Sequence, residues 1–171
     1  MPLLFKKVKV ASIEEFNNFC NQFPNVKYID AIVSDTAGVV RGKRFPVNEI
    51  KKLFISGIQF ATAILLLDVN GDCPDAGGRG FSDGDPDTTF LPVAGSLQIM
   101  PWHKDSLGQV LVTLQDSNFN DCMVDPRNVL AKIWEKFDDL NLSFKIAFEL
   151  EFYLFKKRKN LYAKPEPAIS K

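Results

Sequence analysis

The sequence feature that most constrains the fold is the stretch Ser143 to Phe155, which reads SFKIAFELEFYLF. Every even-numbered position from 144 to 154 is large and apolar, whereas the odd-numbered positions include charged residues. Because successive side chains of a strand point to opposite faces, this alternation predicts a strand with one fully apolar face. We expect that face to be buried.

The opposite face of this strand would carry two neighbouring carboxylates, Glu149 and Glu151. In a strand they would lie roughly 6.6 Å apart, at ~3.3 Å per residue. Glutamate is a poor strand former and adjacent like charges repel, so a compensating partner is expected. Mg²⁺ or Mn²⁺ fits, because hard cations take carboxylate oxygens and each glutamate could hold one ion of a two-metal site. The alternative, which spacing alone slightly favours, is an ordinary solvated strand face.

Composition restricts the class of protein. With 171 residues, 46% of them hydrophobic, the chain can bury a real core. Lys plus Arg and Asp plus Glu both number 21, so no global field favours nucleic acid or an anionic membrane surface. The three cysteines are far apart and odd in number, which fits reduced thiols in the cytoplasm better than disulfides or a zinc site. No apolar run approaches a membrane-spanning length, and we expect no membrane segment.

Local patterns predict an α+β opening. Ser12 and Glu15 form a capping box ahead of an apolar stripe that ends at Pro24, which indicates a helix. Further elements follow from residue type and spacing: strands over 28–34 and 39–45 joined as a hairpin by a turn over 35–38, a helix over 46–57 with Gly57 as a left-handed C-cap, and a buried strand over 60–67.

A glycine- and aspartate-rich loop follows from Asp68 to Asp87. Connections of this length without regular structure are uncommon and are usually functional or disordered. A calcium loop is disfavoured because the glycine in DVNGD comes too early and no glutamate stands twelve residues on. The basic residues Arg41, Lys43 and Arg44 on the hairpin could bind phosphate, but charges on an exposed strand usually only solvate it.

In the second half of the sequence, residue type predicts short strands over 87–92, 95–100 and 110–115. A helix follows, with Asp125 as its N-cap and Pro126 at its first position. A sheet needs several strands, so the strand over 144–155 looks like the first strand of a domain whose remainder is absent from this sequence. We therefore expect a truncated chain.

Several of these segments together resemble the N-terminal part of the glutamine synthetase superfamily, and most of all γ-glutamylpolyamine (γ-glutamylputrescine) synthetases. The resemblance runs from about Val26 to Phe155 and rests on segments that occur in the family's order: Asp85-Pro86-Asp87, Leu91-Pro92, Pro101-Trp102, Gln109-Val110-Leu111-Val112, Asp125-Pro126-Arg127 and Phe148-Glu149-Leu150-Glu151-Phe152. Single pieces are weak signals, but the ordered set ending in a Glu-x-Glu-Phe strand is fairly specific.

The resemblance implies an N-terminal β-grasp domain over 1–116 and the first helix and strand of a truncated catalytic domain over 117–171. It implies an enzyme that activates glutamate with ATP, as γ-glutamyl phosphate, for attack by ammonia or an amine such as putrescine. Glu149 and Glu151 match the family's ligands for the divalent ions. Asp68 matches an aspartate that reaches a neighbouring subunit's active site in a homo-oligomeric ring and helps to bind and deprotonate the amine.

Two departures from the family pattern bear on this reading. Ammonia-using members carry Asp-Gly-Ser-Ser where this chain has Asp68-Val69-Asn70-Gly71, which favours an amine acceptor. Ala147 replaces a glycine common in the family. Since the nucleotide and glutamate residues would lie beyond position 171, we expect the fragment alone to be inactive. Two alternatives remain open, a non-catalytic scaffold of the same family and a free-standing β-grasp interaction module.

Overall fold

The computed structural model describes residues 8–103, 106–115 and 122–169. Contacts divide the chain into two compact units, Met1–Asn141 and Leu142–Lys171. The first unit holds the sheet and its helices. The predicted domain boundary between residues 116 and 117 lies outside the described residues.

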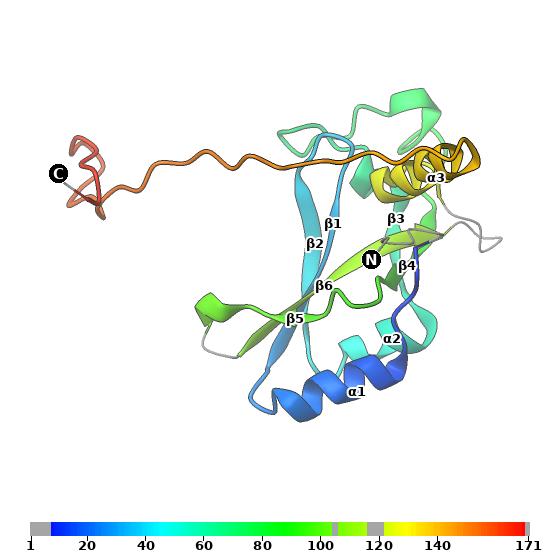
Figure 1. Ribbon diagram of the computed structural model, residues 1–171, viewed down its shortest axis with the longest axis horizontal. Helices are drawn as coiled ribbons and strands as arrows, with labels where there is room; N and C mark the ends of the chain where they lie inside the picture. Colours follow the sequence, from blue (N-terminus) through cyan, green and yellow to red (C-terminus); the bar gives the residue numbers. More distant parts are fainter. Residues whose placement is uncertain (1–7, 104–105, 116–121, 170–171) are drawn as a thin grey trace. The chain divides into compact units, whose positions relative to one another are not determined.

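Six strands form one sheet within the described residues (Figure 1). They are β1 (Tyr28–Ser34), β2 (Val40–Pro46), β3 (Ile58–Ala61), β4 (Asp87–Pro92), β5 (Gln98–Ile99) and β6 (Leu107–Gln115). The order is β2-β1-β6-β4-β3, with β5 paired to β6. β1 and β6 run parallel, and the other pairs are antiparallel. The predicted hairpin is confirmed as the β1–β2 pair, and the fold is a mixed α/β fold.

Three α-helices accompany the sheet in the described chain, α1 (Ile13–Gln22), α2 (Leu53–Ser56) and α3 (Pro126–Asp139). Four short 3₁₀ helices are also present: η1 (Ile50–Lys52), η2 (Thr62–Leu65), η3 (Ala76–Gly78) and η4 (Pro101–His103). The predicted caps are confirmed, since the Ser12 side chain accepts from the Glu15 amide and the Asp125 side chain accepts from the Arg127 amide. Gly57 ends α2 with φ +75°, as its C-cap pattern predicts. Within the described residues, no helix has the length and apolar character needed to cross a membrane.

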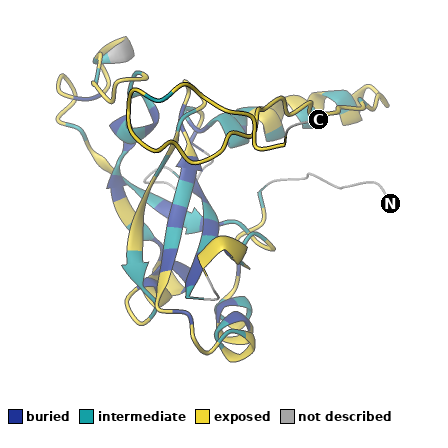
Figure 2. Ribbon diagram, turned by 90° about the vertical axis from the view of Figure 1, so that its left-hand side faces the viewer, coloured by how far each residue is buried: buried dark blue, intermediate teal, exposed yellow. Residues whose placement is uncertain are grey.

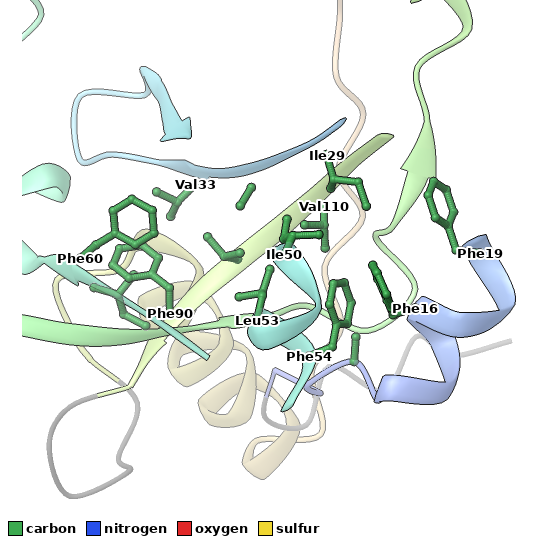
Figure 3. Packing of buried hydrophobic residues seen from close by; sticks show 14 of the residues in the cluster. Phe16, Phe19, Ile29, Val33, Ile50, Leu53, Phe54, Phe60, Phe90 and Val110 are labelled. Carbon is green, nitrogen blue, oxygen red and sulfur yellow. The ribbon is translucent and has the colours of Figure 1, made fainter. Parts of the chain in front are cut away.

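The core lies between the sheet and the helices α1 and α2 (Figure 3). The rings of Phe16 and Phe54 lie 5.0 Å apart at their centroids, and those of Phe60 and Phe90 lie 4.8 Å apart. Gly108 of β6 leaves room for the ring of Phe19 on α1, because a Cβ at residue 108 would stand 2.9 Å from that ring. Burial of each large apolar side chain contributes about 1.5–3 kcal/mol. Figure 2 shows buried residues along the strands of the sheet, and these lie mainly in β1, β4 and β6.

Helix α3 is attached to β6 through polar groups. Within α3 the buried residue is Asn128, whereas Leu130 and Ile133 are exposed. Asp125 Oδ2 accepts from the Thr113 hydroxyl at 2.7 Å and the Leu114 amide at 3.1 Å. The Asn128 side-chain amide donates to the Leu114 carbonyl at 2.9 Å. A buried hydrogen-bond network therefore fixes the start of this helix against the central strand.

Two predicted strands are wrong. The run over 60–67 is strand only to Ala61 and then turns into η2, where the Thr62 hydroxyl donates to the Pro86 carbonyl and the Leu66 amide to the Ala63 carbonyl. Short apolar runs do not distinguish strand from helix by periodicity.

The predicted strand over 144–155 is irregular, with one isolated bridge between Phe155 and Pro167 in the described part of the second unit. Its apolar face is exposed instead of buried, with Phe148 87% and Leu150 84% accessible. A strand needs a neighbour to satisfy its backbone N–H and C=O groups, and no described strand pairs with residues 144–154.

Candidate functional site

Among the predicted functional residues, Asp68 is held by hydrogen bonds from its own loop, which folds around its carboxylate. Its Oδ1 accepts from the backbone amides of Asn70 at 2.8 Å and Asp72 at 2.9 Å. The Asp68 amide in turn donates to the Asp72 carbonyl at 2.9 Å, and the Gly71 amide to the Asp68 carbonyl at 3.0 Å. These contacts form a closed turn over residues 68–72.

The same backbone amides set the charge state of this carboxyl. The hydrogen bond from the Asp72 amide has the largest effect and lowers the pKa of Asp68; burial opposes it, and the amides of Asn70 and Gly71 lower the pKa further, so the pKa lies below its usual value. Asp68 is therefore a stable anion at neutral pH. A carboxylate of this kind is well suited to holding a cation and is a weak proton acceptor.

The turn is attached to the β1–β2 hairpin by an arginine. Arg41 of β2 donates from Nη2 to the Asp68 carbonyl at 2.6 Å and from Nε to Asp35 Oδ2 at 2.8 Å. Asp35 is buried, with 2% of its surface accessible. The sequence predicts Asp35 in the hairpin turn and Arg41 as a solvated strand charge. It does not indicate the contact of Arg41 with Asp68, which spans 27 residues of chain.

The remainder of the predicted loop over 68–87 also folds on its own side chains. Asp75 accepts from the Ser82 amide and hydroxyl, and Asp83 accepts from the Gly80 and Asp85 amides. These bonds give the segment a defined path without a strand or α-helix. The absence of such elements from this segment is as predicted.

A pocket of about 540 Å³ opens beside the Asp68 turn. It is lined by residues from the end of β3, from η2 and the residues after it, from the turn and from the following loop: Ala61, Ala63, Ile64, Leu67, Gly71, Asp72, Cys73, Gly80, Phe81 and Asp85. Asp85 Oδ1 is buried and has no hydrogen-bond partner among the described residues. Mostly apolar walls with carboxylates among them suit a cation with a hydrocarbon part better than an anion.

Glu149 and Glu151 lie in the second unit, in the irregular segment that precedes the Phe155–Pro167 bridge. Both side chains are exposed, and in the described chain neither takes part in a hydrogen bond or an ion pair. Their carboxylates suit Mg²⁺ or Mn²⁺ in donor chemistry. No group of three or more His, Cys, Asp or Glu with metal-binding geometry is present in the described residues.

Comparison with known proteins decides the family. The family model "Glutamine synthetase, catalytic domain" matches residues 123–170, a range that contains both glutamates. The γ-glutamylputrescine synthetase PuuA of Escherichia coli is 35% identical over 150 residues, covering 88% of this chain and 32% of the relative. The chain belongs to the glutamine synthetase superfamily.

Other members of the superfamily match over similar lengths. The glutamate–isopropylamine ligase of a Pseudomonas species is 30% identical over 76% of this chain and 28% of its own length. The glutamine synthetase of Methanosarcina mazei is 26% identical over 77% of this chain and 27% of its own length. The chain thus spans about a third of the length of the curated relatives that it matches.

Solved structures agree on the fold. A structure described as a GmaS/ADP complex aligns with a TM-score of 0.57 at 21% identity, over 73% of this chain and 26% of that one. A structure described as a novel glutamine synthase homolog aligns with a TM-score of 0.55 at 20% identity, over 67% of this chain and 27% of its own. The mixed α/β fold of this chain is therefore similar to that of other members of the superfamily.

Proposed function

We propose that this chain is the N-terminal part of an ATP-dependent γ-glutamyl ligase that joins glutamate to an amine. The observation that carries the proposal is the 35% identity to a γ-glutamylputrescine synthetase over 88% of this chain. The curated relatives include an amine ligase and ammonia-using glutamine synthetases, so a glutamate-activating reaction is the chemistry that their names share.

In the proposed reaction the side-chain carboxylate of glutamate attacks the terminal phosphorus of ATP and ADP leaves, which gives γ-glutamyl phosphate. The ammonium group of the amine first gives one proton to water. The neutral nitrogen then attacks the activated carbonyl carbon, the carbon–oxygen bond to the phosphate breaks, and the second proton of the nitrogen leaves with inorganic phosphate. Glu149 and Glu151 would hold Mg²⁺ or Mn²⁺, together with ligands from outside this chain. When bound, these ions supply charge neutralisation for the phosphate groups.

Asp68 would receive the protonated amine. Its carboxylate is ionised and held by the amides of residues 70 and 72, so it offers a fixed negative charge to an ammonium group. The lowered pKa favours electrostatic binding of the cation over acceptance of its proton. The neighbouring pocket, with apolar walls and the carboxylates of Asp72 and Asp85, supports an alkylamine in preference to ammonia.

We further propose the organisation that goes with this function. The first domain is a β-grasp domain over 1–116, and the catalytic domain begins within 117–171, a boundary supported by the family match from residue 123. The active site lies between subunits of a homo-oligomeric ring, with Asp68 contributed by a neighbouring copy. The cytoplasm is the proposed location, which is consistent with the free thiols of Cys20, Cys73 and Cys122. The 171-residue chain alone is proposed to be inactive.

Phosphate release by the full-length protein tests the proposal. With ATP, Mg²⁺ and glutamate present, we expect a higher kcat/KM for putrescine or isopropylamine than for ammonia. Asp68→Asn should lower kcat/KM for the amine by about 10²-fold and leave the slow glutamate-dependent ATP hydrolysis without amine unchanged. Equal or reversed preference would remove the amine assignment. Absence of any glutamate-dependent ATP hydrolysis in the wild type would instead favour a non-catalytic scaffold.

A further inference from the structure

The hairpin turn between β1 and β2 is built around a buried carboxylate. Asp35 Oδ1 accepts from the backbone amides of Ala37 at 2.9 Å and Val39 at 2.7 Å, and Oδ2 accepts from Arg41 Nε at 2.8 Å. The Asp35 side chain has no accessible surface, and that of Arg41 keeps 18%. Three donors therefore fix this carboxylate, and the carboxylate in turn fixes the guanidinium.

The hairpin turn and the start of β2 are hydrogen-bonded to both ends of residues 65–68, the segment that joins η2 to the Asp68 turn. The backbone amide and the hydroxyl of Thr36 both donate to the Leu65 carbonyl at 3.0 Å. Arg41 Nη2 donates to the Asp68 carbonyl at 2.6 Å. Since the guanidinium is planar and rigid, its bond to Asp35 determines where the second donor points. The Asp68 carbonyl is thereby located relative to the sheet.

We propose that Arg41 is a positioning residue for Asp68, through which the β1–β2 hairpin sets the place where the incoming amine is received. The proposal rests on the function proposed for Asp68. Arg41 acts through the Asp68 backbone and does not touch the substrate. A displacement near 1 Å at a binding group is enough to cost about 10²-fold in rate, so loss of this bond should impair use of the amine and spare the activation of glutamate.

The chain contains a matched control on the same strand. Arg44 donates from both Nε and Nη2 to Asp30 of β1, at 2.7 and 2.9 Å, whereas Arg41 gives one donor to Asp35 and the other to the Asp68 carbonyl. The Arg44 side chain is 53% exposed, and neither of its bonds to Asp30 reaches the loop after η2. Arg41→Lys and Arg44→Lys are therefore the same chemical change, but within the described residues only Arg41 of the two is bonded to Asp68.

Lysine is informative at these positions because it retains the charge but offers a single compact ammonium group. It cannot donate in a fixed geometry to Asp35 and the Asp68 carbonyl together. Arg41→Gln, which loses the charge and keeps a side-chain amide, serves as a second variant if Arg41→Lys fails to fold. Glutamine has a single donor nitrogen and cannot replace both Nε and Nη2 of Arg41, so the same result is expected.

The first measurement is hydrogen exchange in the full-length protein, read from a peptide covering residues 66–73. Arg41→Lys should speed exchange of the Asn70 and Asp72 amides by about tenfold and leave peptides of β6 unchanged. Arg44→Lys should alter neither. Unchanged exchange at Asn70 and Asp72 in a folded Arg41 variant would overturn the proposal, as would an equal effect of the two arginine variants.

The second measurement is a double-mutant cycle on steady-state kinetics. Arg41→Lys should raise the KM for the amine by about tenfold, with the KM values for ATP and glutamate unchanged, and should have no further effect in an Asp68→Asn background. Additive effects would overturn the positioning role. If Asp68→Asn itself leaves amine use unchanged, the proposed function of Asp68 fails. If Asp68→Asn impairs amine use and Arg41→Lys does not, the positioning inference alone fails.

Discussion

The buried network at the start of α3 gives the sharpest prediction about stability. Asp125 is 1% exposed, and among the described residues its two oxygens accept three hydrogen bonds, from the Thr113 hydroxyl and from the amides of Leu114 and Arg127. Asp125→Ala removes both acceptor oxygens and with them these three hydrogen bonds. The Thr113 hydroxyl keeps Asn128 Oδ1 as a partner at 3.1 Å, whereas the Leu114 amide is left buried without an acceptor.

The expected cost follows from these groups. Loss of an N-cap side chain costs about 1 kcal/mol, and a buried donor left unsatisfied costs about 1–3 kcal/mol. We therefore expect Asp125→Ala to lower the free energy of unfolding by about 3 kcal/mol, which corresponds to a fall in Tm of about 6–12 °C for a chain of this length. Asp125→Asn keeps one acceptor oxygen for the cap but replaces the other oxygen with an NH₂ group, which faces hydrogen-bond donors. We therefore expect it to lower the free energy of unfolding by about 2 kcal/mol.

Urea unfolding of this chain, followed by circular dichroism, measures the difference. The control is Ser12→Ala at the cap of α1, where the exposed hydroxyl accepts one bond of 3.4 Å from the Glu15 amide. That change should cost about 0.5 kcal/mol. If Asp125→Ala costs no more than Ser12→Ala, the reasoning about the buried network is refuted.

Two further predictions concern the β1–β2 hairpin. Gly42→Ala should cost about 2 kcal/mol or more, because a Cβ at residue 42 would overlap the carbonyl oxygen of Ala31. Gly38→Ala, at φ +80° with open space around it, should cost about 1–2 kcal/mol from backbone conformation alone; a larger loss at Gly38 than at Gly42 in thermal melts would contradict this. For Asp35, burial raises the pKa, but hydrogen bonds from Arg41 and the turn amides outweigh it and lower the pKa overall. The ionised form therefore stabilises the fold fully above the unfolded-state value of about 3.9, and the stability gap between wild type and Asp35→Asn should shrink as pH falls through the lower folded-state pKa. A gap that stays constant from neutral pH to about pH 2 would contradict this assignment.

Features determined by neighbouring residues could be predicted from the sequence. The capping patterns at Ser12 and Asp125 and the left-handed position of Gly57 depend on a few adjacent residues, and all three occur in the structure. The hairpin was predictable for the same reason, since alternating residues flank a turn that starts at Asp35.

Features determined by distant contacts could not be predicted. The apolar run over 60–67 changes from β3 to η2 because Thr62 bonds to Pro86, which lies 24 residues away. The alternation over 144–155 predicts a strand, yet a strand forms only where a partner strand pairs with it, and the described chain supplies none. Arg41 and Asp68 are joined across 27 residues, a contact that strand charge patterns do not indicate.

The proposed metal role of Glu149 and Glu151 is tested most directly by changing both to glutamine in the full-length protein. Glu166→Gln is the control, since Glu166 is an exposed glutamate of the same unit paired with Lys156 at 3.5 Å. We predict that the double variant loses Mn²⁺ affinity in calorimetric titration and at least about 10²-fold in Mg²⁺-dependent turnover with glutamate, ATP and amine, while Glu166→Gln matches the wild type. Full turnover and unchanged Mn²⁺ binding in the double variant would contradict the account.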